Sequence, residues 1–437
     1  MKRTASIVLL PLLVLLLTSA AWPAALPAPW STALVPALTL LLLLACVITQ
    51  PPPLRLWAAG VGLLVLLYAY VWNPSHSWSA TAGLVPQDYH TGWPAAAYPP
   101  GARAALLFAG TVWTAFVAGV SLSRRQLGWL PALAALATAG MALVVISQRL
   151  EPNAPRIREF TGIFVNENHY AVFANLLLPV VLAGAARARF RAVQAGLPSS
   201  PAGLFYLAAA LSAAGVVMSK SRAGVAVMAL LVGAHVLLHW RTVRRYPFAG
   251  VPLSPVFKAL GVAAFLTAVA FAVRAFWAEW QQVSAITSEW TYRSGILRHS
   301  FTAWQELPRW GYGPGSFAII FPYYQAAEYA RHTILHAHCE PMQFLVEYGW
   351  AGVAILLALT ALAFSTRRAP PVADPAEVPA FADCERCAFG LALVAGVLHC
   401  LVDFPLRIPL LALLIALWAG VWVASRPHPD LTPRSEA

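Results

Sequence analysis

Two histidines near a glutamate form one stretch of this chain that could do chemistry. Residues 335–340 read Leu-His-Ala-His-Cys-Glu. In an extended segment His336 and His338 point the same way, whereas in a helix they point to different sides. An imidazole that titrates near neutral pH can take a proton from a hydroxyl, and two histidines with Glu340 could also bind a metal ion. A general base, a metal site and a purely structural role all stay open at this point.

Basic residues form a second candidate group. Lys220 and Arg222 lie in Ser-Lys-Ser-Arg-Ala-Gly, and Arg293 and Arg298 follow an aromatic stretch. Arginine binds phosphate through two parallel hydrogen bonds, although a basic side chain at the end of an apolar span can instead reach lipid phosphates. On one helix Arg293 and Arg298 would diverge by about 140°, so we expect only one of them to reach a given ligand. His169, in Asn-Glu-Asn-His-Tyr, is a weaker candidate.

Together, two separated arginine sites and a histidine suit a ligand that carries phosphates and a hydroxyl to be activated. These segments contain no cluster of Asp and Glu with metal-ligand spacing, so arginine instead of Mg²⁺ would meet the charge of a diphosphate leaving group. The chain also lacks a Walker loop and a Rossmann glycine pattern, which counts against a nucleotide-driven pump.

The composition indicates that the elements holding these residues lie in a membrane. Of the 437 residues, 59% are apolar and 11% are charged, whereas soluble domains carry about 45–50% apolar and about 25% charged residues. A soluble enzyme, a disordered protein and a disulfide-built secreted module are therefore excluded. In a membrane protein, the net charge of +12 reflects basic loops and contact with anionic membrane lipids, and it does not indicate a nucleic-acid partner.

Hydropathy predicts an all-α polytopic membrane protein with about twelve transmembrane helices, because about 20 apolar residues cross the hydrocarbon core. The first apolar run could also be a signal peptide, since Lys2 and Arg3 precede it. The predicted spans are 5–20, 31–49, 56–73, 104–122, 128–147, 170–186, 203–218, 223–239, 258–277, 350–366, 387–403 and 408–425.

Basic residues in alternate loops predict the orientation. Arg55, Arg124 and Arg125, and Arg367 and Arg368 are among those that place one set of loops, and both termini, in the cytoplasm. The candidate residues above then lie on the outer side.

We expect three parts along the chain. Transmembrane helices 1–9 with short loops occupy 1–277, and helices 10–12 with a cytoplasmic tail occupy 350–437. Between them lies a large outward loop, 278–349, which we call the cap. Its many aromatic residues predict short helices that lie in the headgroup zone.

Five stretches of the chain resemble, in matching order, motifs of the O-antigen ligase and O-antigen polymerase superfamily of bacterial envelope glycosyltransferases. The family usually reads His-Ala-His-Asn-Asp and Ser-Arg-Gly-Gly. Here Cys339 and Glu340 follow the second histidine, and Ala223 follows Arg222, so the histidine and the arginine are kept. The matching stretches are 164–170, 219–224, 293–315, 336–349 and 399–405.

The resemblance implies an inverting glycosyl transfer, without metal or other cofactor, at the outer (periplasmic) face of the bacterial inner membrane. The donor is a glycan on undecaprenyl diphosphate, and the acceptor is a hydroxyl of lipid A–core oligosaccharide or another glycolipid. His338 maps to the histidine that activates the acceptor, and Arg222 and Arg293 map to arginines that hold the diphosphate. We expect four further residues to bind substrate: Lys220, Arg298, His336 and His169.

Two alternatives to a ligase stay open. A polymerase would use the same donor chemistry but take another lipid-linked repeat as the acceptor, and the shared motifs do not separate the two. A transporter of an anionic substrate is disfavoured, because the sequence shows neither matched halves nor a charged residue in the middle of a span.

Overall fold

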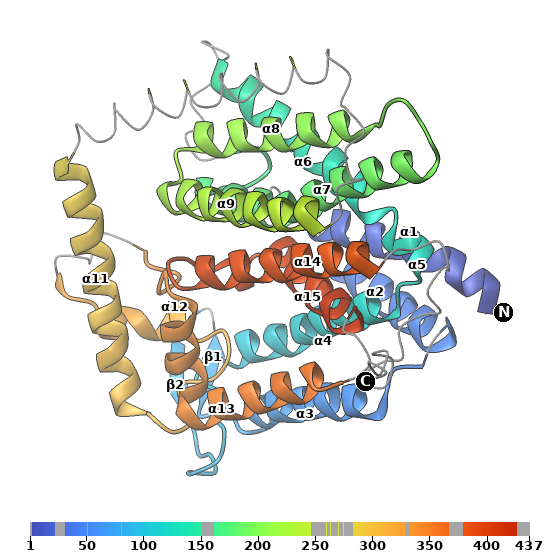
Figure 1. Cartoon of the computed structure of the whole chain (residues 1–437). Helices are drawn as coiled ribbons and strands as arrows, with labels where there is room; N and C mark the ends of the chain where they lie inside the picture. The colour runs from blue at the N-terminus through green and yellow to red at the C-terminus, as the bar shows by residue number, and fades with distance from the viewer. Residues whose placement is uncertain are drawn as a thin grey trace, which may run out of the picture.

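The structure is a computed structural model, and it is built from long helices packed side by side (Figure 1). It describes residues 2–21, 31–49, 51–79, 81–150, 161–245, 283–327, 333–366 and 379–425, with residues 259, 263, 270 and 274. The long helices are α1 (Lys2–Ala21), α2 (Ser31–Thr49), α3 (Leu54–Trp72), α4 (Pro99–Ser121), α6 (Leu130–Leu150), α7 (Glu167–Gln194), α8 (Ala202–Ser219), α9 (Arg222–Arg245), α11 (Val283–Glu306), α13 (Glu340–Phe364), α14 (Pro379–Cys400) and α15 (Pro409–Ala424).

Helices lie at eleven of the twelve predicted spans, and the span 258–277 lies almost wholly outside the described residues. Within the described residues, six helices are long and apolar enough to cross a membrane, and four more are apolar but shorter. A helical membrane protein therefore fits the structure, while the number of twelve crossings stays a prediction. The six long ones are 54–72, 99–121, 124–148, 167–194, 202–219 and 340–364.

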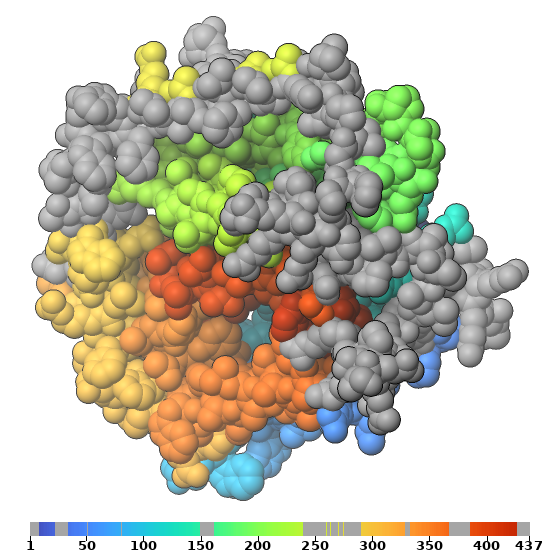
Figure 2. All heavy atoms as spheres, viewed as in Figure 1, coloured from blue at the N-terminus to red at the C-terminus, as the bar shows by residue number. Residues whose placement is uncertain are grey.

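Helix α7 lies at the centre of the bundle. Every residue from His169 to Ala185 is buried, as expected for a helix that is apolar on all sides. It packs against α6, α8, α9, α14 and α15. In Figures 1 and 2, α14 and α15 lie between the group formed by α6 to α9 and the group formed by α3, α4 and α13. The first turn of α7, with His169, lies at one end of the bundle.

Two features differ from the sequence-based expectation. The segment after α3 forms a two-stranded antiparallel hairpin of β1 (His76–Ser79) and β2 (Gly83–Pro86), so the fold is not purely helical. The cap, expected to hold short helices, contains the long helix α11 beside the short α12 (Phe317–Ile320) and the 3₁₀ turn η2 (Phe321–Tyr323). Aromatic density alone did not reveal that residues 283–306 continue without a break.

Helix α13 starts at Glu340, well before the predicted span at 350, and it is kinked at Gly349. This glycine has φ 63° and ψ 178°, a conformation that almost only glycine adopts. The kink frees backbone groups, and the loop 308–313 pairs with them. Tyr312 N donates to Val346 O at 2.9 Å, and Trp350 N donates to Pro308 O at 2.9 Å. Irregular backbone is tolerated in a membrane where protein satisfies it in this way.

The segment 74–98 braces this loop from the other side. The side chain of Asn73 donates to the carbonyls of His90 and Pro94, both at 3.0 Å. Trp310 Nε1 donates to Gly92 O at 2.8 Å, and Ala97 N donates to Tyr312 O at 2.8 Å. The hairpin segment therefore holds loop 308–313, in the middle of the cap, in place.

Candidate functional site

The candidate residues gather at the end of the bundle where α7, α9 and α13 begin and α14 ends. Two irregular segments meet there: residues 333–339, which lead into α13, and residues 401–408, which link α14 to α15 and include the 3₁₀ turn η4 (Pro405–Arg407). A small apolar core supports the first segment, because Ile334 and Ala337 pack with Ile296 of α11 and Val346 of α13.

Phe404 is the centre of a histidine cluster. The ring of His336 stacks on it with centroids 4.1 Å apart. The rings of His169 and His338 meet it edge-on at 4.8 Å and 5.1 Å. The cluster thus joins the first turn of α7, the segment before α13 and the link after α14. His336 and His338 both face one ring, so the segment before α13 is not helical, although the backbone at His338 is not extended either.

His338 has φ 52°, in the left-handed region that few residues other than glycine adopt. The Nδ1 atom of His338 lies 3.5 Å from Oδ1 of Asp403. The histidine side chain is 25% exposed, whereas that of Asp403 is 2% exposed. A buried carboxylate therefore faces a partly exposed imidazole.

The environment keeps Asp403 ionised. Burial alone would raise the pKa of this carboxyl, but His338 and His169 beside it lower the pKa, and the net shift is downward. An ionised carboxylate behind a histidine favours one tautomer and stabilises the imidazolium that forms when the ring takes a proton.

His336 differs from His338 in its surroundings. Burial, followed by the positive charge of Arg407, lowers the pKa of His336 to about 4. Its Nδ1 atom lies 3.4 Å from Nε2 of Gln343. His336 is therefore neutral at physiological pH and is poorly matched to the work of a base, which leaves His338 as the better candidate of the two.

Arg293, on α11, contacts the link between α14 and α15. Its Nη1 atom donates to the carbonyl oxygen of Val402 at 2.9 Å, directly before Asp403. Arg298 lies on the same helix but is exposed, as the helical spacing predicts for two arginines that diverge. The structure thus brings Arg293, and not Arg298, to the link that carries Asp403 and Phe404.

Lys220 and Arg222 lie at the turn between α8 and α9. Lys220 ends α8 with φ 68°, and Arg222 is the first residue of α9; both are exposed. Ser221 Oγ donates to Asn168 Oδ1 at 2.6 Å, next to His169. The turn is therefore attached to the first turn of α7, which also carries His169 of the histidine cluster.

A buried polar contact attaches the start of α9 to α14 as well. Asn175 Nδ2 donates to Gly224 O at 2.9 Å and lies 3.1 Å from Nε2 of His399. Helices α7, α9 and α14 are thereby joined nearly two turns along α7 from His169, which restricts how far Arg222 can move relative to Asp403.

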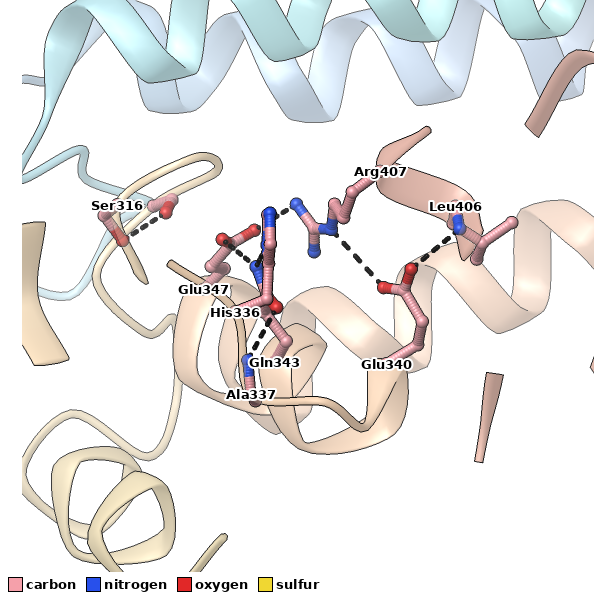
Figure 3. A network of polar contacts seen from close by, with 9 residues as sticks. Ser316, His336, Ala337, Glu340, Gln343, Glu347, Leu406 and Arg407 are labelled. Atoms are coloured by element: carbon pink, nitrogen blue, oxygen red, sulfur yellow. Dashed lines mark hydrogen bonds and ion pairs between the residues drawn. The ribbon is translucent and has the colours of Figure 1, made fainter. Parts of the chain in front are cut away.

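The sequence-based interpretation missed Arg407 and its pairing with Glu340 and Glu347. Arg407 Nη1 donates to Glu347 Oε2 at 2.8 Å, and its Nε donates to Glu340 Oε2 at 3.3 Å (Figure 3). Burial alone would lower the pKa of Arg407, but Glu347 and Glu340 raise it above its ordinary value. A signal was available, because Arg407 lies in a link between two predicted spans that is predicted to face outward, where positive-inside sorting does not explain a basic residue.

The metal alternative required Glu340 beside the two histidines. Glu340 instead accepts from Leu406 N at 2.8 Å and from Arg407. Among the residues that the structure describes, no group of three or more His, Cys, Asp and Glu side chains is placed to hold a metal ion.

Comparison with known families gives one finding. Residues 207–357 match the family model described as O-antigen ligase, which confirms the resemblance seen in the sequence. This stretch includes Arg222, Arg293, His336 and His338. A comparison with curated proteins found no match.

Proposed function

From the O-antigen ligase family, with which residues 207–357 align, we propose that this protein is a ligase-type glycosyltransferase. It transfers a glycan from undecaprenyl diphosphate to a hydroxyl of lipid A–core oligosaccharide, with inversion and without a metal ion. The reaction takes place on the periplasmic side of the bacterial inner membrane. The contact of His338 with buried, ionised Asp403 is the observation that supports this proposal most directly.

In the proposed reaction, His338 removes the proton from the acceptor hydroxyl. Because Nδ1 of His338 faces Asp403, Nε2 is the atom that accepts the proton. The acceptor oxygen forms a bond to the anomeric carbon of the donor sugar, and the bond from that carbon to the diphosphate oxygen breaks. Undecaprenyl diphosphate leaves with the electron pair, and the proton stays on His338 until it passes to solvent.

Arg222 and Arg293 hold the diphosphate and stabilise the negative charge that grows on it. Two observations support this role. Arg293 lies against the link that contains Asp403, and the turn that contains Arg222 is attached to Asn168, next to His169 of the histidine cluster. Lys220, Arg298 and His169 are proposed to contact other parts of the substrates, and His336 to shape the wall beside the acceptor through its contact with Phe404.

The test uses the purified full-length chain in detergent or nanodiscs, with a lipid-linked glycan donor and lipid A–core as the acceptor. We expect transfer by the wild-type protein, full activity in EDTA, and loss of transfer in His338→Ala at unchanged expression. Wild-type-like activity of His338→Ala would remove the general-base assignment, and dependence on added Zn²⁺ or Mg²⁺ would contradict the metal-independent mechanism.

The same assay separates the alternatives. If the only acceptor used is a second lipid-linked repeat, the protein is a polymerase. If reconstituted vesicles take up the anionic substrate and no glycan is transferred, the protein is a transporter.

A further inference from the structure

A buried ion network lies directly behind the histidine cluster. The side chain of Arg407 is 18% exposed, and those of Glu340 and Glu347 are 2% and 1% exposed. The two glutamates are seven residues apart on α13, so they lie on one face, two turns apart. Arg407 bridges this face from η4 (Figure 3). Buried charges are costly unless paired, and here one guanidinium is held between two carboxylates.

The network continues to the segment that carries both histidines. Gln343 Nε2 donates to Glu347 Oε1 at 3.2 Å. Gln343 Oε1 accepts from the backbone N of Ala337 at 3.1 Å, between His336 and His338. An unbroken chain of hydrogen bonds therefore runs from Arg407 through Glu347 and Gln343 to the backbone of Ala337, as Figure 3 shows. His338 is the next residue in the chain.

The network also determines where Asp403 and Phe404 lie. Glu340 Oε1 accepts from Leu406 N at 2.8 Å, and Arg407 N donates to Phe404 O at 3.1 Å. Glu340 therefore contacts η4 at two points. Its Oε1 accepts from the backbone of Leu406, and its Oε2 accepts from the guanidinium of Arg407, so both carboxylate oxygens are needed. The same three charged residues thus hold the two segments whose contact brings His338 to Asp403.

We propose that Arg407, Glu340 and Glu347 are positioning residues for the glycosyl transfer: they hold the segment 403–407 against the segment 336–338, so that His338 keeps its contact with Asp403. This inference rests on the proposed function. None of the three residues touches the reacting atoms. Their effect is on the geometry of the base, so their loss lowers kcat more than it weakens donor binding.

The test compares conservative variants. Glu340→Asp keeps the charge but shortens the side chain by one methylene, so it cannot reach Leu406 N and Arg407 Nε together. Arg407→Lys keeps the charge but offers a single nitrogen in place of the separate Nε and Nη1 atoms that reach Glu340 and Glu347. We expect kcat to fall at least tenfold in each, with the KM for the donor within about threefold of wild type. Glu347→Gln still accepts a hydrogen bond, so its kcat should lie between those of these two variants and that of wild type.

A matched control comes from the other end of α7. Arg187 Nη1 and Glu385 Oε1 form an ion pair at 2.8 Å, with side chains 11% and 10% exposed. Glu385→Gln removes the negative charge from a buried ion pair that has no part in the proposed site. It should lower the unfolding temperature about as much as Glu340→Asp does, while kcat stays within twofold of wild type.

Hydrogen exchange provides a readout that does not depend on activity. Glu340→Asp and Arg407→Lys should speed amide exchange in residues 333–340 and 401–408, and Glu385→Gln should not. Unchanged exchange in these segments, or kcat within twofold of wild type in both variants, would overturn the proposal. If the wild-type protein transfers no glycan, the proposed function fails, and the exchange result alone still decides whether the network holds the two segments together.

Discussion

Nδ1 of His338 lies 3.5 Å from Oδ1 of Asp403, across the gap between the segment before α13 and the link after α14. The carboxylate is buried and has a lowered pKa, while the imidazole is partly exposed. A general base needs this arrangement, in which a fixed negative charge lies beside one ring nitrogen and the side chain is still partly exposed. The relationship supports His338 over His336 as the residue that receives the proton.

Neutralising Asp403 should therefore damage catalysis with little effect on binding. Asp403→Asn is nearly isosteric and removes the charge behind His338. We expect kcat to fall by about a hundredfold or more, because an orienting acid that is neutralised leaves its histidine in the wrong tautomer. Steady-state kinetics with the donor and acceptor varied separately check this. A kcat within threefold of wild type would show that the contact does not matter for the reaction.

The two arginines of α11 should differ in their effect. Arg293 is anchored at Val402 O, whereas Arg298 is exposed. We expect Arg293→Ala to lower kcat/KM by at least a hundredfold and Arg298→Ala by less than tenfold, because only Arg293 lies where a diphosphate next to His338 could contact it. Transfer assays at equal protein levels measure both. Equal losses in the two variants would contradict the assignment.

Acidification should destabilise the protein partly through His336. The pKa of His336 in the folded protein is lowered from 6.5 to about 4, so between these values the unfolded chain binds a proton that the folded chain does not. Stability therefore falls as the pH drops from about 6.5 to 4. His336→Phe keeps an aromatic ring against Phe404 and removes the titration. When the pH is lowered from 7 to 5, the unfolding temperature of this variant should fall less than that of wild type. If the two plots of unfolding temperature against pH run parallel, the prediction is wrong.

Gly349 should not tolerate a side chain. It has positive φ, and a Cβ there would collide with the backbone of Arg309 and Trp310. The conformational strain alone costs about 1–3 kcal/mol, so Gly349→Ala should lower the yield of folded protein or its unfolding temperature. Gly110→Ala in α4 is the control, because a Cβ there meets nothing within 4 Å. Size-exclusion profiles and thermal unfolding compare the two, and similar behaviour would contradict the role assigned to the kink.

Local patterns in the sequence were enough to predict several parts of this protein. Arg222 and Arg293 stand out because positive-inside sorting does not explain basic residues in segments predicted to face outward, and His336 and His338 stand out by their spacing and the nearby Glu340. The stretch with Gly311 and Gly313 and the stretch ending at Gly349 were recognised as motifs. Their physical role, the pairing of loop 308–313 with the kink of α13, could not be read from either stretch alone, because each supplies only half of the hydrogen bonds.

Composition and hydropathy are sums over residues. They were enough to predict a membrane environment, a helical fold and the approximate positions of the helices. The partners of the charged groups were decided only by the tertiary structure. Asp403 faces His338, Arg407 bridges Glu340 and Glu347, and Arg293 reaches Val402. Each of these pairs joins segments that are distant in the chain, and which segments meet depends on how α7, α13, α14 and the cap pack together. Because the energy of a charge pair depends on the distance between the groups and on their burial in the folded protein, no local pattern could have specified these partners.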